Sequence, residues 1–116
     1  MQHDPRAYLW DARESALAIQ SFVADLDINS YSLNLMAQAA TERKFEIIGE
    51  ALNQLSKVDP LIAAKIPELA QIVSFRNQLI HGYSKIKPST VWSVVSSSLP
   101  SLLQKVNELL EELGHD

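Results

Sequence analysis

The chain has 116 residues, 47% of them hydrophobic, a formal net charge of -4 and no cysteine. A chain of this length and composition can bury its own core, and it has no disulfide framework, zinc ribbon or thiol nucleophile. The net negative charge argues against a broad basic surface that binds nucleic acid, so any contact with RNA or DNA must be local. We therefore expect a single domain over residues 1–116.

Residues 1–16 lack the basic and apolar regions of a signal peptide, and no apolar run approaches the roughly 18 residues that a membrane span needs. We expect a soluble, cytoplasmic protein with no membrane partner.

The first predicted helix starts at Pro5, with Asp4 as its N-cap, and runs to about Leu26. Trp10 and Leu17 lie nearly opposite its apolar stripe, which leaves two readings open: a second apolar interface, or two scattered surface residues. The stripe consists of Tyr8, Leu9, Ala12, Ala16, Ile19, Phe22, Val23 and Leu26.

The segment DINSYS reads as a polar break, after which Ser30 or Ser32 can cap a helix that runs to about Leu55 or Ser56. Gly49 lies inside this helix. A glycine there costs about 1 kcal/mol relative to alanine, so it predicts close approach of another backbone. The expected inward stripe is Leu33, Met36, Ala37, Ala40, Ile47, Ile48, Ala51 and Leu55.

Asp59-Pro60 predicts a short helical turn, and Pro67 fits the first turn of a third long helix that ends at His81, with Gly82 as its C-terminal cap. Pro88 opens the last helical stretch, and Pro100 predicts a kink or break near Leu99. The sequence therefore predicts an all-α, antiparallel bundle of four to five helices.

Arg76 projects near the middle of an apolar stripe in the third helix. An unpartnered guanidinium there would lose several kcal/mol of hydration, so a carboxylate, carbonyl groups or the anion of a ligand must compensate it. An ion pair with Glu46 or Glu50 is the structural alternative. The stripe is Leu69, Ile72, Val73, Phe75, Leu79 and Ile80.

His81 follows Arg76 by five residues, which is roughly 140° round the helix and about 7.5 Å along it. The long arginine can still bend toward the helix end, so that the two side chains flank one phosphate-sized site. Asn77 can position the imidazole or a ligand oxygen, and the helix dipole favours imidazolium at this end. Tyr83 places a phenol beside the site, or packs as a half-buried tyrosine.

Other chemistry has weaker support. His3 and His115 lie at opposite ends of the chain, no HxxxH or HExxH pair occurs, and the three glycines form no phosphate-binding loop. We expect neither a metal site nor a cofactor.

The stretch RNQLIHGY resembles the signature of the HEPN superfamily, and more narrowly that of the HepT-like ribonuclease toxins: Arg, Asn, three residues, His, one residue, Tyr. KFEIIGEALNQLS is similar to the second helix of that family, and PSTVWSVVSSSLPSLL to its region after the motif. YLWDARESALAIQSF is compatible with its first helix, so the resemblance covers nearly the whole chain.

The resemblance implies a homodimeric, metal-independent endoribonuclease with two motif copies facing each other across a cleft. His81 would serve as general base or acid, Arg76 would hold the scissile phosphate, and Asn77 would orient the pair. It also implies a nucleotidyltransferase antitoxin that attaches AMP to Tyr83. Lys85 and Lys87 are candidate RNA contacts in a loop that lacks the acidic residue of many relatives.

Two other classes of function stay open. The chain could be a catalytically inactive module that binds a nucleotide or the nucleotidyltransferase. Alternatively, Arg76 could be a purely structural ion-pair partner, in which case Arg76→Ala would mainly destabilise the fold, by about 3 kcal/mol or more.

Overall fold

A computed structural model describes residues 4–82 and 86–114. Every regular element in these ranges is helical, which confirms the predicted all-α class. The elements are α1 (Pro5–Val23), α2 (Ile28–Leu33), α3 (Leu35–Val58), α4 (Pro60–Ala63), α5 (Leu69–His81), α6 (Pro88–Ser93), the π-helix η1 (Val94–Ser98) and α7 (Leu99–Leu113).

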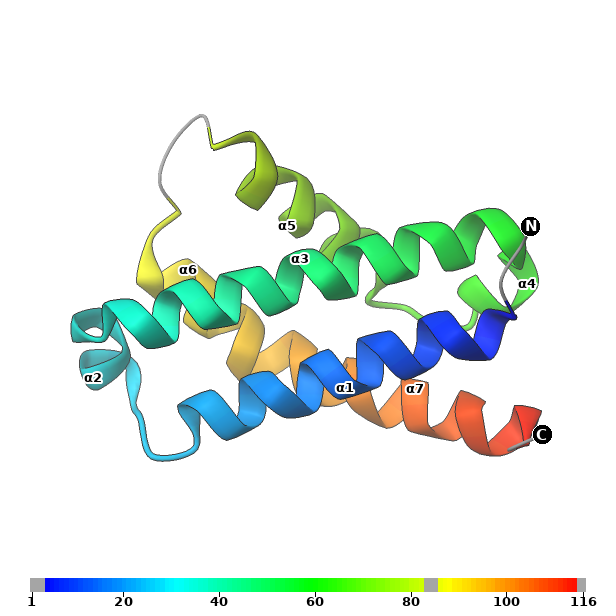
Figure 1. The fold of residues 1–116 in the computed structure, drawn as a ribbon, viewed down its shortest axis with the longest axis horizontal. Helices are drawn as coiled ribbons and strands as arrows, with labels where there is room; N and C mark the ends of the chain where they lie inside the picture. Colours follow the sequence, from blue (N-terminus) through cyan, green and yellow to red (C-terminus); the bar gives the residue numbers. More distant parts are fainter. Residues whose placement is uncertain (1–3, 83–85, 115–116) are drawn as a thin grey trace.

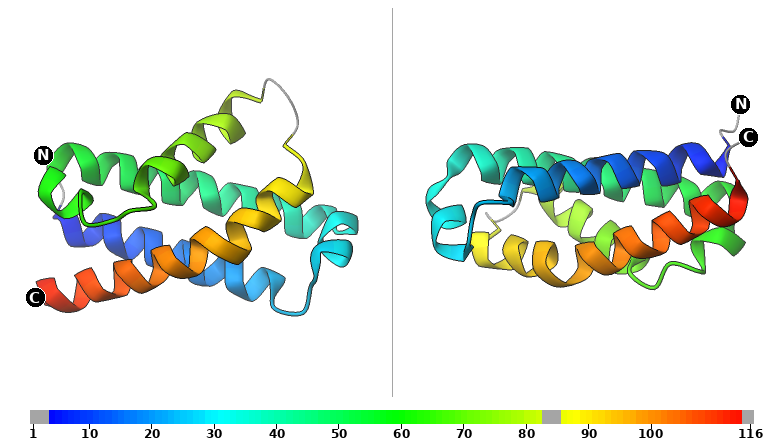
Figure 2. Two further views of the ribbon diagram at one scale, coloured as in Figure 1. Left: turned by 180° about the vertical axis from the view of Figure 1, so that it is seen from behind. Right: turned by 90° about the horizontal axis from the view of Figure 1, so that it is seen from below.

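The long helices alternate in direction, so the bundle is antiparallel as predicted (Figure 1). α1 and α3 pack along each other, α5 packs on α3, and α7 packs on α1. Seen from below, α1 and α3 form one layer, and α5 lies with the continuous α6–η1–α7 segment in a second layer (Figure 2). α3 therefore joins the layer that contains α1 to the helix that carries the RNQLIH sequence.

The core between these layers is apolar and tightly closed. Phe45 on α3 and Phe75 on α5 meet edge to face, with ring centroids 5.2 Å apart. This contact fixes α5 against α3 immediately before Arg76 in the sequence. The largest side chains with less than 2% exposure are Tyr31, Phe45, Leu9, Ile19, Ile48, Leu52, Leu55, Ile72, Leu99, Leu102, Val91 and Val106.

Two helix starts follow the predicted cap-then-proline pattern. The Asp4 carboxylate accepts a hydrogen bond from the backbone N–H of Arg6 at 2.9 Å, and the Asp59 carboxylate accepts one from Ile62 at 3.1 Å. In both helices the proline occupies the first turn, where no intrahelical N–H is needed. α1 ends at Val23 rather than Leu26, because the next residues form a tighter turn in which Leu26 N–H donates to the Val23 carbonyl.

The prediction of a polar break at DINSYS was wrong, because these residues build α2. Asp27 caps this helix: its carboxylate accepts from Ser30 N–H at 2.8 Å, and the Ser30 hydroxyl oxygen accepts from Asp27 N–H at 2.9 Å. Ser32 is no cap either, since its hydroxyl donates back to the Ile28 carbonyl. The true break is Asn34, whose side chain caps α3 through the backbone N–H of Ala37.

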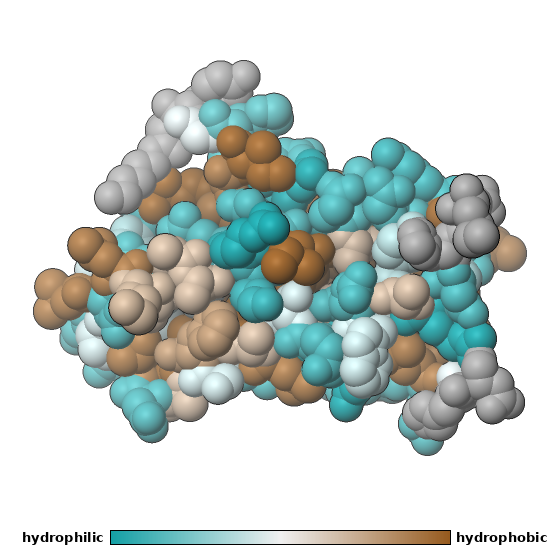
Figure 3. Space-filling view, viewed as in Figure 1, coloured by the Kyte–Doolittle hydropathy of each residue, from teal (hydrophilic) through white to brown (hydrophobic). Residues whose placement is uncertain are grey.

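The break at Asn34 also overturns part of the predicted stripe of the second helix. Leu33 and Met36 were expected to face inward, but they are 87% and 83% exposed, and Leu35 between them is 73% exposed. They form an apolar surface at the end of the molecule where α2 meets α3 (Figure 3). The predicted stripe assumed one continuous helix through position 34. Because α2 and α3 are separate helices with different axes, that assumption assigned Leu33 and Met36 to the wrong face.

The break predicted near Leu99 does not occur, and the local change before Pro100 is a π-helix. The five residues before Leu99 adopt a π-helix, so the segment bulges and continues instead of breaking. Proline has no N–H to donate to the preceding turn, and a locally wider turn accommodates that loss.

Trp10 and Leu17 lie on the exposed side of α1, as predicted, with 52% and 38% of their surface accessible. The Arg13 guanidinium lies 5.2 Å from the Trp10 ring centroid. This cation-π contact covers part of the indole. Trp10 and Arg13 also line a groove between α1 and α7.

Tyr31 should make folding stability sensitive to alkaline pH. Burial raises the pKa of this phenol to about 12, the Glu42 charge adds to the increase, and Thr41 opposes it. An unfolded tyrosine titrates near pH 10, so the stabilisation is complete below about pH 10 and is lost between about pH 10 and 12. The free energy of unfolding, measured in urea, should fall between pH about 9 and pH about 11.5. This fall should be smaller in Tyr31→Phe than in the wild type, by up to about 2 kcal/mol. Equal losses in both proteins would contradict this assignment.

Candidate active site

The α5 helix carries Arg76, Asn77 and His81. His81 is its last residue and is exposed. Gly82 follows in the left-handed conformation, with φ 61°, and its N–H points back to the Gln78 carbonyl. The predicted C-terminal cap is thus confirmed, and it fixes the end of α5 directly after the histidine.

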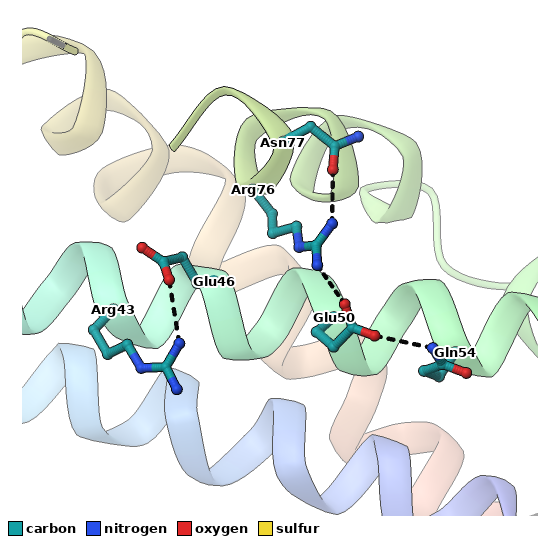
Figure 4. Close-up of polar contacts among 6 residues, drawn as sticks. All are labelled: Arg43, Glu46, Glu50, Gln54, Arg76 and Asn77. Carbon is teal, nitrogen blue, oxygen red and sulfur yellow. Dashed lines mark hydrogen bonds and ion pairs between the residues drawn. The ribbon is translucent and has the colours of Figure 1, made fainter. Parts of the chain in front are cut away.

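Arg76 is partly buried, with 24% of its side chain exposed. Its Nη2 donates to Glu50 Oε2 on α3 at 2.5 Å, and its Nη1 donates to Asn77 Oδ1 at 2.9 Å (Figure 4). The predicted ion pair therefore exists, and Glu50 rather than Glu46 is the partner. Glu46 instead pairs with Arg43, one turn earlier on α3.

The guanidinium of Arg76 keeps part of its hydrogen-bonding capacity. Arginine carries five N–H donors, and the bonds to Glu50 and Asn77 use two of them. Nε is buried and has no hydrogen-bond partner in the part of the chain that the structure describes. The other N–H groups on Nη1 and Nη2 remain available to an anion without loss of either contact.

Gly49 explains how α5 comes this close to α3. A Cβ built on Gly49 would overlap the Cβ of Arg76 and would lie 2.6 Å from its Cγ. The predicted close approach at this glycine is confirmed, although the nearest atoms belong to the Arg76 side chain rather than to a backbone. Because Glu50 follows Gly49 directly, the same crossing places the carboxylate next to the guanidinium.

Gly49→Ala should therefore destabilise the protein and displace Arg76. The overlap involves the base of the arginine side chain, which cannot swing away, so we expect a net loss of about 1 to 2 kcal/mol despite the better helix propensity of alanine. Urea unfolding gives the loss. In an Arg76→Gly background, which lacks both Cβ and Cγ, the penalty should be smaller. Strictly additive effects of the two substitutions would contradict a direct clash.

A cavity of about 280 Å³ opens beside Arg76, between α1, α3 and α5. Both arginine–glutamate pairs line it, together with Asp11 from α1 and Ile80 from α5. The motif arginine thus faces a defined space with mixed charged and apolar walls, rather than the open surface.

The structure joins only part of the predicted site. Arg76 donates a hydrogen bond to Asn77, which is compatible with the expected role of Asn77 in orienting the pair for the arginine half. Lys87 is exposed at the start of α6. Tyr83 and Lys85 lie outside the described residues.

Sequence reasoning missed Asp11 and the cavity as features of the site. It named Glu50 only as a possible ion-pair partner, although the adjacent glycine was a signal for it. In residues 4–82 and 86–114, no three histidine or acidic side chains gather as metal ligands would. No helix in the same ranges has the length and apolarity needed to cross a bilayer.

Comparison with known proteins agrees with the motif. The model of the family described as ribonuclease HepT-like matches residues 12–109. A protein of Methanocaldococcus jannaschii, provisionally named RNase MJ1380, is 33% identical over 107 residues, covering 90% of this chain and 95% of the relative. A Thermococcus cleftensis protein, provisionally named ribonuclease HepT, is 28% identical over 109 residues, covering 94% and 98% of the two chains.

No solved structure gives a significant match to the chain. The family match spans most of the sequence and includes every residue of the RNQLIHGY motif. The chain therefore belongs to the HepT-like ribonuclease family, and the enzyme class that this indicates is an RNA endonuclease.

Proposed function

We propose that the chain is a metal-independent endoribonuclease toxin whose catalytic residues are Arg76 and His81. The observation that carries this proposal is the state of Arg76: Glu50 and Asn77 hold its guanidinium at a cavity, yet it keeps N–H donors for an anion. A scissile phosphate is such an anion, and an RNA strand supplies it.

The proposed reaction uses the ribose next to that phosphate. The 2′-oxygen attacks phosphorus, the bond from phosphorus to the 5′-oxygen breaks, and a 2′,3′-cyclic phosphate remains on one product. One His81 accepts the 2′-OH proton, and a second, protonated His81 gives a proton to the leaving 5′-oxygen. Arg76 stabilises the charge that develops on the phosphoryl oxygens, and Asn77 keeps the guanidinium group of Arg76 oriented.

Two histidines require two chains, so we propose a homodimer with the α5 ends facing a shared cleft. Exposure of His81 at the last position of α5 supports this arrangement, since a partner subunit can approach it. Lys87, and with it Lys85, would attract the RNA backbone locally, although the chain as a whole is acidic.

A substrate lacking one hydroxyl group tests this reaction. Wild-type protein in EDTA should cut an RNA oligonucleotide and leave a 2′,3′-cyclic phosphate. The same oligonucleotide with a 2′-deoxyribose at the mapped cleavage position should stay intact there. Cleavage of the deoxy-substituted position would contradict attack by the 2′-oxygen, and dependence on an added divalent metal would contradict a metal-independent mechanism.

We further propose that a cytoplasmic nucleotidyltransferase antitoxin neutralises the enzyme by attaching AMP to Tyr83. Tyr83 stands two residues after His81, so the added phosphate and adenosine would repel and occlude RNA. Incubation with a candidate nucleotidyltransferase antitoxin and ATP should add AMP to the wild type and not to Tyr83→Phe, as read by mass spectrometry. AMP on another residue would contradict this regulation.

A second candidate follows from the Arg76–Glu50 ion pair, since a carboxylate already neutralises the arginine. The chain would then be a catalytically inactive module that binds a nucleotide or the nucleotidyltransferase. Affinity for a nucleotide without any RNA cleavage would favour this candidate.

A further inference from the structure

The cavity beside Arg76 has a distinctive charge balance. It is lined by two arginines and three carboxylates, and each arginine is paired with a glutamate: Arg43 with Glu46 and Arg76 with Glu50. The Arg43–Glu46 pair lies along α3, and the Arg76–Glu50 pair joins α5 to α3 (Figure 4). The third carboxylate, that of Asp11, makes no hydrogen bond or ion pair within the described ranges. The cavity thus presents one surplus acceptor and no surplus cation.

The acceptors in this cavity suit a ligand that presents N–H donors. An ionised carboxylate only accepts hydrogen bonds, and its two oxygens can accept from two adjacent donors at once. Glu46 adds an oxygen, because only its Oε1 pairs with Arg43. Gln54 donates its amide to Glu50 at 2.9 Å, which leaves its carbonyl oxygen as a further acceptor.

Apolar groups form the rest of the wall. Ile47 and Ala51 contribute from α3, Ile80 from α5, and the Tyr8 ring from α1. Ile80 is 47% exposed, so part of its side chain is accessible to a ligand. A ligand with a flat apolar face, such as an aromatic ring, can pack against these side chains. The volume of about 280 Å³ lies just below the range for drug-sized ligands and suits a single ring system with its substituents.

We infer that this cavity binds the guanine base of a nucleotide next to the scissile phosphate, with Asp11 as the residue that determines specificity. This inference rests on the proposed ribonuclease function and deepens it. Guanine offers its ring N1–H and its 2-amino group side by side, as a bidentate match for one carboxylate. Adenine and cytosine place a ring acceptor next to their amino group, and uracil flanks its single N–H with two carbonyl oxygens. The phosphate of the same nucleotide would lie on Arg76, which lines the cavity.

Binding of mononucleotides tests this inference independently of cleavage. Titration of the full chain with guanosine 3′-monophosphate and with uridine 3′-monophosphate, followed by NMR or calorimetry, should show at least about tenfold tighter binding of the guanosine nucleotide. Asp11→Asn should reduce the preference to about twofold or less, because the amide presents one acceptor and a repelling NH₂ group. Asp25→Asn is the matched control: it makes the same change of charge at an exposed aspartate outside the cavity, and it should retain the preference.

The outcomes separate this inference from the proposed function. Equal affinities for the two nucleotides, or an unchanged preference in Asp11→Asn, would overturn the guanine site even if the chain cuts RNA. Guanosine preference that depends on Asp11, in a protein that cuts no RNA, would support the site and reject the ribonuclease proposal. If both hold, cleavage positions in a random RNA pool should be enriched for guanosine beside the cut.

Discussion

His81→Ala should lower the rate of RNA cleavage by a factor of about 10² to 10⁴, the usual contribution of a general acid or base. The variant should still fold, because His81 is exposed at the end of α5 and lies outside the buried core. Single-turnover cleavage of a labelled RNA, beside urea unfolding of both proteins, measures the two effects.

Gln78→Ala is the matched control for this substitution. Gln78 is also an exposed residue in the last turn of α5, so its replacement tests whether any change of the surface there impairs cleavage. The control should cleave at the wild-type rate. If it loses as much activity as His81→Ala, the effect belongs to the end of the helix and the imidazole has no special role.

Arg76→Lys should reduce cleavage by a factor of about 10² to 10³, as expected for loss of an oriented donor at the developing phosphoryl charge. Lysine keeps the charge but lacks the planar fork that contacts Glu50 and Asn77 together and still presents N–H groups to a phosphate. The predicted loss of folding stability is only about 1 kcal/mol, because the Glu50 side chain is 46% exposed and water screens the pair.

This combination separates the functional and structural interpretations of Arg76. A purely structural arginine predicts the reverse: a loss of about 3 kcal/mol or more on replacement by alanine, with normal cleavage once the protein is folded. Arg43→Lys is the control, since Arg43 lines the same cavity and pairs with Glu46 but is 69% exposed and outside the motif. Equal loss of activity in both arginine variants would argue against a specific role for Arg76.

The sequence predicted the part of the fold that depends on local signals. The caps at Asp4, Asp59 and Gly82 lie where expected, because each rests on one residue whose side chain or φ angle decides the conformation. The mid-helix glycine predicted the close approach of another element, which the structure identifies as α5. A glycine at a buried helical position leaves room that only a neighbouring element can fill.

Features that depend on how the helices pack against one another were harder to predict from the sequence. Glu46 and Glu50 stand one turn apart on the same face of α3, so the choice between them depends on the point at which α5 crosses. The helix break at Asn34 was hidden because Ser30 and Ser32 were equally plausible caps, and the error turned Leu33 and Met36 the wrong way. The cavity combines residues from three helices, and no periodicity within one helix reveals it.

The central claim is most directly tested by cleavage of total cellular RNA and tRNA by the purified wild-type chain in EDTA, with mass spectrometry confirming that Tyr83 carries no AMP. We predict discrete cleavage products with the wild type and none with folded His81→Ala. Intact RNA in both reactions would contradict the ribonuclease assignment of this site for those substrates and would favour the binding module.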